Sequence, residues 1–154
     1  MVSSSGPGPV LLAGTTRDIP ALRALLLAIP AETHGRVLLE AQAAVQIRAL
    51  PAHPGISVIW LLRDEARWSV RPGDRLAQAV TAWLSEWQIS PDSPALLWLG
   101  ARELPVVDRL AHALALRPGI ASVAEFGACS CPHPQDVPPH DADPAPHPSQ
   151  KEFP

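Results

Sequence analysis

Two patterns in this chain of 154 residues have residue types and spacing suited to binding chemistry. One is a glycine directly after a short apolar run, with hydroxyl or basic side chains behind it. The other is a Cys-x-Cys pair with histidines nearby. The glycine pattern suits phosphate groups, because glycine lets the backbone approach a ligand and free N–H groups at a helix start favour negative charge. The cysteine pattern suits soft or borderline metal ions.

The glycine pattern occurs at two places, residues 10–17 and residues 95–102. In each, an apolar run ends at a glycine, and small, hydroxyl or basic side chains follow it. The candidate ligand contacts there are Gly14, Thr15, Thr16, Arg17, Gly100, Ala101 and Arg102. A plain strand-to-helix turn is the alternative at the first place, because no G-x-G-x-x-G sequence marks a dinucleotide loop. Both interpretations stay open from the residues alone.

Arg63 is a further candidate, since it directly follows the apolar run 56–62. A planar guanidinium can bind a phosphate with two parallel hydrogen bonds, which suits the 2′-phosphate of a ribose. The alternative is an exposed arginine at a strand end, paired with Asp64 or Glu65.

The metal-binding candidates are Cys129, Cys131 and His133. Their spacing is that of neither a standard zinc module nor an iron–sulfur motif. They also fall in a segment in which prolines crowd together, with eight of the 19 prolines within residues 132–154. Such a composition cannot bury enough apolar surface to offset its ordering entropy. A disordered tail is therefore the interpretation we prefer to a metal-delivery segment.

Apolar patterning predicts the elements that position the glycine candidates. Continuous runs predict strands at residues 10–13, 37–41, 56–62, 95–99 and 121–126. Helical spacing of apolar residues predicts helices at residues 22–29, 76–87 and 104–114, and a short one at 43–50 with Val45, Ile47 and Leu50 as its apolar side. Strands that alternate with helices predict a parallel sheet covered on both faces, which is an α/β three-layer Rossmann-like domain.

Length and composition fit one such domain. We expect a flexible N-terminus over residues 1–9, the folded domain over residues 10–127 and the tail over residues 128–154. The formal net charge is −3 and the basic residues are scattered, so neither nucleic acid nor a membrane surface is expected as a partner. No run approaches the ~18 apolar residues of a membrane span, and no secretory signal begins the chain. A cytoplasmic, bacterial protein is the expectation.

Three stretches resemble the C-terminal domain of siderophore-interacting proteins, the flavin-dependent ferric-siderophore reductases. Residues 11–22, LLAGTTRDIPAL, are similar to the family's strand and Gly-Asp-Glu-Thr-Ala-Leu-Pro-Ala motif. Residues 35–42 and 53–63 are similar to a strand that ends in Glu-Val and to a Trp-Leu-x-Arg strand. Residues 96–110 are similar to the Trp-x-Ala-Gly-Glu strand and the helix after it. The residues that match are Gly14, Pro20, Ala21, Trp60, Leu61, Arg63 and Trp98.

The resemblance implies a parallel sheet of about five strands, like the nucleotide half of ferredoxin reductases, and adds Pro20 and Trp98 to the candidate contacts. It implies NADPH or NADH as cofactor, with FAD supplied only by a flavin-binding partner, in electron transfer to chelated ferric iron. Thr15 and Thr16 stand where the family has an acidic pair, and Arg102 stands near its glutamate. A catalytically degenerate interaction or regulatory module is therefore the alternative function. No catalytic residue is predicted, because no nucleophile–base pattern is present and chemistry would come from a cofactor.

Overall fold

A central sheet of five parallel strands forms the domain, in a computed structural model that describes residues 8–63, 70–87, 89 and 94–122. The strands are β1 (Val10–Thr15), β2 (Gly35–Ala41), β3 (Ile56–Leu62), β4 (Ala95–Leu99) and β5 (Ile120–Ser122), in the order β3-β2-β1-β4-β5. The helices are α1 (Ile19–Ala28), α2 (Asp74–Glu86) and α3 (Pro105–Ala115), and two 3-10 turns are η1 (Thr16–Asp18) and η2 (Ala44–Gln46). Every strand pair is parallel.

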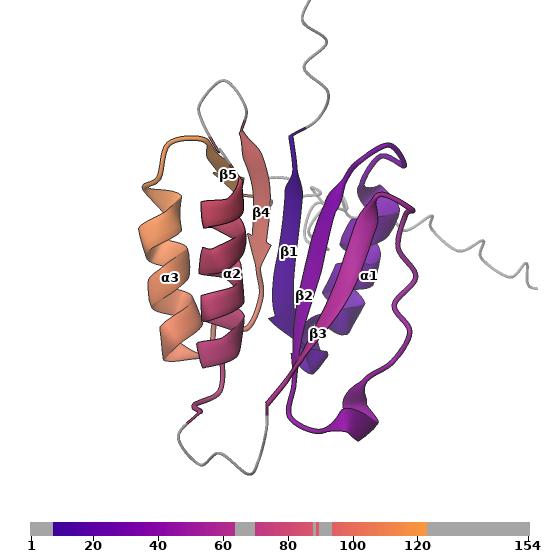
Figure 1. Ribbon diagram of the computed structural model, residues 1–154, viewed down its shortest axis with the longest axis vertical. Helices are drawn as coiled ribbons and strands as arrows, with labels where there is room; N and C mark the ends of the chain where they lie inside the picture. Colours follow the sequence, from indigo (N-terminus) through magenta and orange to yellow (C-terminus); the bar gives the residue numbers. More distant parts are fainter. Residues whose placement is uncertain (1–7, 64–69, 88, 90–93, 123–154) are drawn as a thin grey trace, which may run out of the picture.

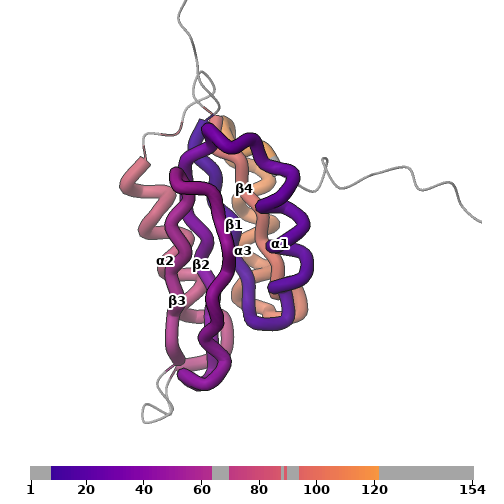
Figure 2. Tube along the Cα trace, turned by 90° about the vertical axis from the view of Figure 1, so that its right-hand side faces the viewer, coloured from indigo at the N-terminus to yellow at the C-terminus, as the bar shows by residue number. Residues whose placement is uncertain are grey.

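The helices lie on both faces of the sheet, so the domain has three layers (Figure 1). One apolar core lies under α2 and α3 and includes Leu11, Trp83 and Val107. A second core lies under α1 and includes Leu12 and Leu22. The view turned by 90° shows α1 on the near face of the sheet, with α3 behind it (Figure 2). Alternating residues of β1 therefore enter opposite cores, which is the packing expected of a parallel strand buried on both faces.

The predicted α/β three-layer fold is confirmed, with two local differences. β1 runs on to Thr15, so Gly14 lies within the strand instead of ending it. The helix predicted over residues 43–50 is wrong, because only the three-residue turn η2 forms there. Val45, predicted to face the core, is 87% exposed. Of the last predicted strand, the structure has Ile120–Ser122, and residues 123–126 lie outside the described part of the chain.

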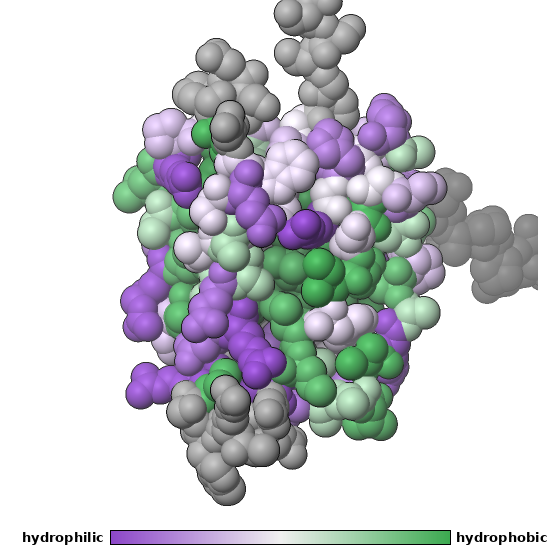
Figure 3. Space-filling view, in the orientation of Figure 1, coloured by the Kyte–Doolittle hydropathy of each residue, from purple (hydrophilic) through white to green (hydrophobic). Residues whose placement is uncertain are grey.

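One edge strand of the sheet is β3, which pairs only with β2 among the described strands. Exposed apolar side chains lie on β3 and on the connection that precedes it, at Val45, Ile47, Ile59 and Leu62. The apolar surface around this edge is visible as green atoms in the space-filling view (Figure 3). An unpaired strand edge with apolar neighbours is a surface that can accept another strand.

A buried carboxylate connects β2 to the start of α2. Glu40, only 6% exposed, accepts hydrogen bonds from the backbone N–H groups of Gly73 (2.9 Å) and Leu76 (3.2 Å). These groups are among those that a helix start leaves without partners, and a negative charge there is favourable. Gly73 has φ of 87°, which a glycine adopts at little cost. Glu40 thus fixes where α2 begins against the sheet.

Glu40→Gln is expected to lower the free energy of unfolding by about 1.5–3 kcal/mol, because hydrogen bonds to a charged acceptor are worth roughly this much. The amide that replaces the carboxylate has only one oxygen, so its NH₂ group would face one of the two backbone N–H donors and could not accept a hydrogen bond from it. Chemical denaturation of both proteins measures the difference. Glu86→Gln is the matched control, since its pair with Arg36 is exposed and 3.4 Å long, and we expect it to cost less than about 1 kcal/mol. Equal losses in the two variants would contradict the capping role of Glu40.

Candidate functional site

The order of the strands reverses at β1, because the chain passes from β1 outward to β2 and β3 and later returns to add β4 on the other side. In open parallel sheets, ligands bind outside the carboxyl ends of the strands at such a point. The arrows of β1 and β4 both point toward the lower part of Figure 1. The segments that meet there follow β1 and β4, and the N–H of Gly100 donates to the carbonyl of Ala13 (2.8 Å). We refer to this place as the switch point.

The switch point holds the side chain of Asp18. Its Oδ2 accepts hydrogen bonds from the backbone N–H of Thr15 (2.7 Å) and from the Thr15 hydroxyl (3.0 Å). The carboxylate therefore already accepts a hydrogen bond from the N–H group of Thr15, which was predicted to bind an anionic ligand. It satisfies one free donor at the start of η1 and α1, as a capping side chain does.

Glycine is required on both strands that flank Asp18. A Cβ built on Gly14 would lie 2.7 Å from Asp18 Oδ2. A Cβ built on Gly100 would lie 2.6 Å from Asp18 Oδ1 and 2.7 Å from Cη2 of Trp98. The two glycine-ended patterns found in the sequence thus meet around one carboxylate, and each glycine leaves the room that this carboxylate fills.

Beside the switch point, toward β2 and β3, a cavity of about 440 Å³ lies between α1 and the η2 connection. Thr16 and Pro20, both predicted contacts, line it. So do residues that the sequence analysis missed, and the full lining is Thr16, Ile19, Pro20, Arg23, Gln46, Arg48, Ala49, Leu50 and Trp60. We call it the arginine cavity. Its residues come from three segments far apart in the sequence, so no local motif marks it.

The other basic candidates have different surroundings. Arg63 follows β3, and its backbone N–H donates to Ala41 (2.8 Å), which extends the pairing of β2 with β3. Its half-buried side chain makes no hydrogen bond or ion pair with a residue that the structure describes. Arg17 is exposed on η1. Asp64 and Glu65, the alternative partners of Arg63, lie outside the described residues.

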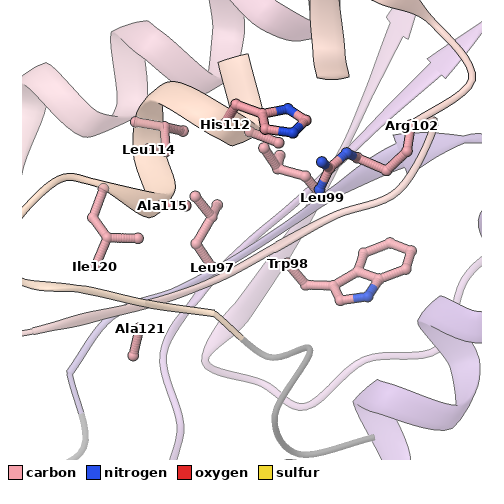
Figure 4. A pocket seen from close by; sticks show the side chains of 10 residues that line it. Leu97, Trp98, Leu99, Arg102, His112, Leu114, Ala115, Ile120 and Ala121 are labelled. Atoms are coloured by element: carbon pink, nitrogen blue, oxygen red, sulfur yellow. The ribbon is translucent and has the colours of Figure 1, made fainter. Parts of the chain in front are cut away.

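Arg102 is engaged on the far side of the switch point. Its Nε donates to Asp108 Oδ1 (2.8 Å), and His112 Nδ1 lies 3.4 Å from the other oxygen of that carboxylate. Arg102 and His112 line a second cavity of about 440 Å³ between α3 and the β4–β5 edge. The close view shows Trp98, another lining residue, on the opposite side of β4 from these two (Figure 4). Ala101, which directly precedes Arg102, is 2% exposed and has φ of 54°.

The structure therefore brings Gly14, Thr15, Trp98 and Gly100 together around Asp18, whereas Thr16 and Pro20 face the arginine cavity. Arg102 lies with α3. The weak metal candidates Cys129, Cys131 and His133 lie outside the described residues. Within residues 8–63, 70–87, 89 and 94–122, no group of three or more His, Cys, Asp or Glu could hold a metal ion. No helix in the same part of the chain is long and apolar enough to cross a bilayer.

Strand order and helices on both faces define a doubly wound, Rossmann-like α/β domain. The profile of the family described as "Siderophore-interacting protein" matches residues 8–122. The chain belongs to the siderophore-interacting protein family.

Solved structures of this family share the fold. Siderophore-interacting protein SipS from Aeromonas hydrophila is 15% identical, with 76% of this chain and 51% of that chain covered and a TM-score of 0.50. A siderophore utilization protein from T. fusca is 20% identical, with 76% and 44% covered and a TM-score of 0.50. The chain thus spans about half the length of each. No curated protein matches this sequence.

The contact between Gly100 and Asp18 can be measured with a double-mutant cycle. Gly100→Ala is expected to cost about 1–3 kcal/mol of stability through overpacking. In an Asp18→Ala background the cost should fall, because the carboxylate that meets the new Cβ is gone. Asp108→Ala is the matched control background, and there the full cost should remain. If Gly100→Ala costs as much stability in the Asp18→Ala background as in the unaltered protein, the new Cβ clashes with Trp98 instead.

Proposed function

We propose that this domain is the nucleotide half of a reductase related to siderophore-interacting proteins. It binds NADPH or NADH at the carboxyl edge of the sheet and acts with FAD carried on a separate flavin-bearing chain or domain. Electrons would pass from the nucleotide to the flavin and then, one to each ion, to chelated ferric iron. The expected bacterial cytoplasmic location agrees with this role and stays a prediction.

One observation carries the proposal, the meeting of Gly14 and Gly100 at the switch point. Gly14 near the end of β1 and Gly100 directly after β4 have no side chains, so both leave room beside the main chain, now filled by Asp18, at the point where this class of fold takes its ligand. Hydrogen-bond donors follow the strands at this edge, because Thr16 and Arg17 come directly after β1 and Arg63 comes directly after β3. Such donors suit an anionic ligand.

The residues fit a nucleotide on one condition. A pyrophosphate over Gly14 needs the N–H of Thr15, which now donates to Asp18. The phosphate and the carboxylate of Asp18 are both negative and need the same N–H group. The side chain of Asp18 therefore has to rotate away before the phosphates can bind. A ribose is different, because its hydroxyl groups can donate to the carboxylate where it lies.

When bound, the nicotinamide ring supplies a hydride, which carries two electrons and which the flavin of the separate chain or domain accepts. The residues of this chain hold and orient the nucleotide. Trp98 lies on β4, with its ring near Gly100 at the switch point. It is placed to limit how far a flat ring can move along that strand. Ala101 and Arg102 lie on the other side of β4, toward α3.

A second candidate function is an interaction or regulatory module without catalysis. Two observations favour it. The carboxylate of Asp18 already satisfies the N–H that a phosphate would need. The open β3 edge exposes Ile59 and Leu62, which suits pairing with a partner strand. This function needs no nucleotide, so the experiment below separates the two candidates.

Thermal unfolding with and without each nucleotide tests the proposed function. A ligand present at 100 times its dissociation constant, and bound only by the folded state, adds about 2.7 kcal/mol. We expect NADPH to raise Tm and Arg63→Ala to reduce the shift, with Arg109→Ala on α3 as the control that leaves it unchanged. No shift with millimolar NADPH or NADH would remove the reductase assignment and support the interaction module.

Asp18→Asn is expected to bind NADPH several-fold more tightly than the unaltered protein. The amide keeps the shape of the side chain and removes the negative charge that a phosphate meets. Calorimetric titration of both proteins measures the difference. Asp108→Asn, which removes a carboxylate from α3, is the control. Weaker binding by Asp18→Asn would show instead that the carboxylate accepts hydrogen bonds from the ligand, as a ribose would provide.

A further inference from the structure

We propose that the arginine cavity is a phosphate-binding subsite. It binds a nucleoside that has a flat base and a phosphate monoester on its ribose, as in the 2′-phosphoadenosine half of NADPH. This inference rests on the proposed function and deepens it, since it assigns the discrimination between NADPH and NADH to Arg23 and Arg48. Those two residues matched no part of the family resemblance and were not among the predicted contacts.

Three segments converge on the cavity from different parts of the fold. Arg23 comes from α1, one helical turn after Pro20, and both line the hollow. Gln46 and Arg48 come from the connection between β2 and β3. Trp60 comes from β3 and belongs to the residues packed against the core under α1. The connection thus turns its polar side chains toward the start of α1 instead of forming the predicted helix.

The polar groups of the cavity are almost all hydrogen-bond donors. The two guanidinium groups have no acceptor. The Oε1 of Gln46 already accepts from the backbone N–H of Gln42 (2.7 Å) and of Ala43 (3.2 Å), so its amide offers the cavity its NH₂ group. Among the residues that the structure describes, no Asp or Glu lines the cavity. A set of donors without a carboxylate is complementary to a phosphate, which offers only acceptors when it is fully ionised.

Neither arginine has a counter-ion among the described residues, in contrast to two other arginines of the domain. Arg36 pairs with Glu86 (3.4 Å) and Arg102 pairs with Asp108 (2.8 Å). Arg23 and Arg48 instead line one cavity to which no described carboxylate contributes. A doubly charged phosphate would neutralise both and accept bidentate hydrogen bonds from each.

The remaining walls suit a flat base. Trp60 contributes an indole ring, and Ile19, Pro20 and Leu50 contribute apolar surface. The volume of about 440 Å³ lies within the range of small-molecule sites, roughly 300–1,000 Å³. Thr16, at one end of the lining, directly follows Thr15 of the switch point. A nucleotide with its phosphorylated ribose in the cavity can therefore extend along the carboxyl edge of the sheet toward Gly14.

The test is calorimetric titration of the full chain with 2′,5′-ADP, with 5′-AMP as the ligand that lacks the 2′-phosphate. We expect 2′,5′-ADP to bind at least tenfold more tightly than 5′-AMP, and Arg23→Gln and Arg48→Gln each to reduce that ratio about tenfold or more. Arg48→Lys should recover little of it, because an ammonium group cannot bind bidentately. Arg109→Gln, an exposed arginine on the opposite face, is the matched control. Circular dichroism of each variant shows that the fold is intact.

The outcomes separate this inference from the proposed function. If NADPH binds with a preference that Arg23→Gln and Arg48→Gln do not change, the inference falls and Arg63 becomes the residue to test, while the proposed function stands. If 2′,5′-ADP binds through Arg23 and Arg48 but NADPH transfers no electrons to any flavin protein, the subsite stands and the reductase function falls. If the unaltered chain binds neither 2′,5′-ADP nor NADPH at millimolar concentration, the cavity takes no nucleotide phosphate and the inference is overturned.

Discussion

β1 is buried along both of its faces and both of its edges, and the other elements are arranged around it. A parallel strand in such a position loses all of its contact with water, so each N–H and C=O must pair with a neighbouring strand. β2 and β4 supply these partners, in registers that run from Val10 to Thr15 on one side and from Val10 to Ala13 on the other. The side chains of β1 require apolar cover on two sides, which α1 provides on one face and α2 with α3 on the other.

This arrangement brings the carboxyl ends of the strands to one edge, and two carboxylates there serve the main chain. Glu40 at the end of β2 caps α2, and Asp18 after β1 holds the N–H of Thr15. In dinucleotide-binding folds an acidic residue near these positions is free to bind a ribose. Here Glu40 is buried in a structural role and Asp18 lies between Gly14 and Gly100. The groups that remain available to a ligand at this edge of the sheet are therefore mainly hydrogen-bond donors.

The arginine cavity follows from the same geometry. The connection between β2 and β3 has no helix to cover the sheet, so its polar side chains face α1 across a hollow instead of packing against it. The chain belongs to the family and shares its fold, but it spans only about half the length of its solved relatives. The proposed function needs a flavin-bearing chain or domain, and the nucleotide subsite can be examined without it.

The alternation of apolar runs and helical patterns was sufficient to predict the order of strands and helices, because burial on both faces leaves a continuous apolar run in each strand. It also predicted that Gly14 and Gly100 would end two strands, and Gly100 does directly follow β4, whereas β1 runs on past Gly14 to Thr15. Tertiary structure alone decided what lies between those glycines. No sequence spacing indicates that the carboxylate of Asp18 fills the space that both leave, since that contact depends on β1 and β4 being neighbours. For the same reason Arg23 and Arg48 gave no signal. They belong to one cavity only because the packing of α1 and the unpredicted course of residues 43–50 bring them together.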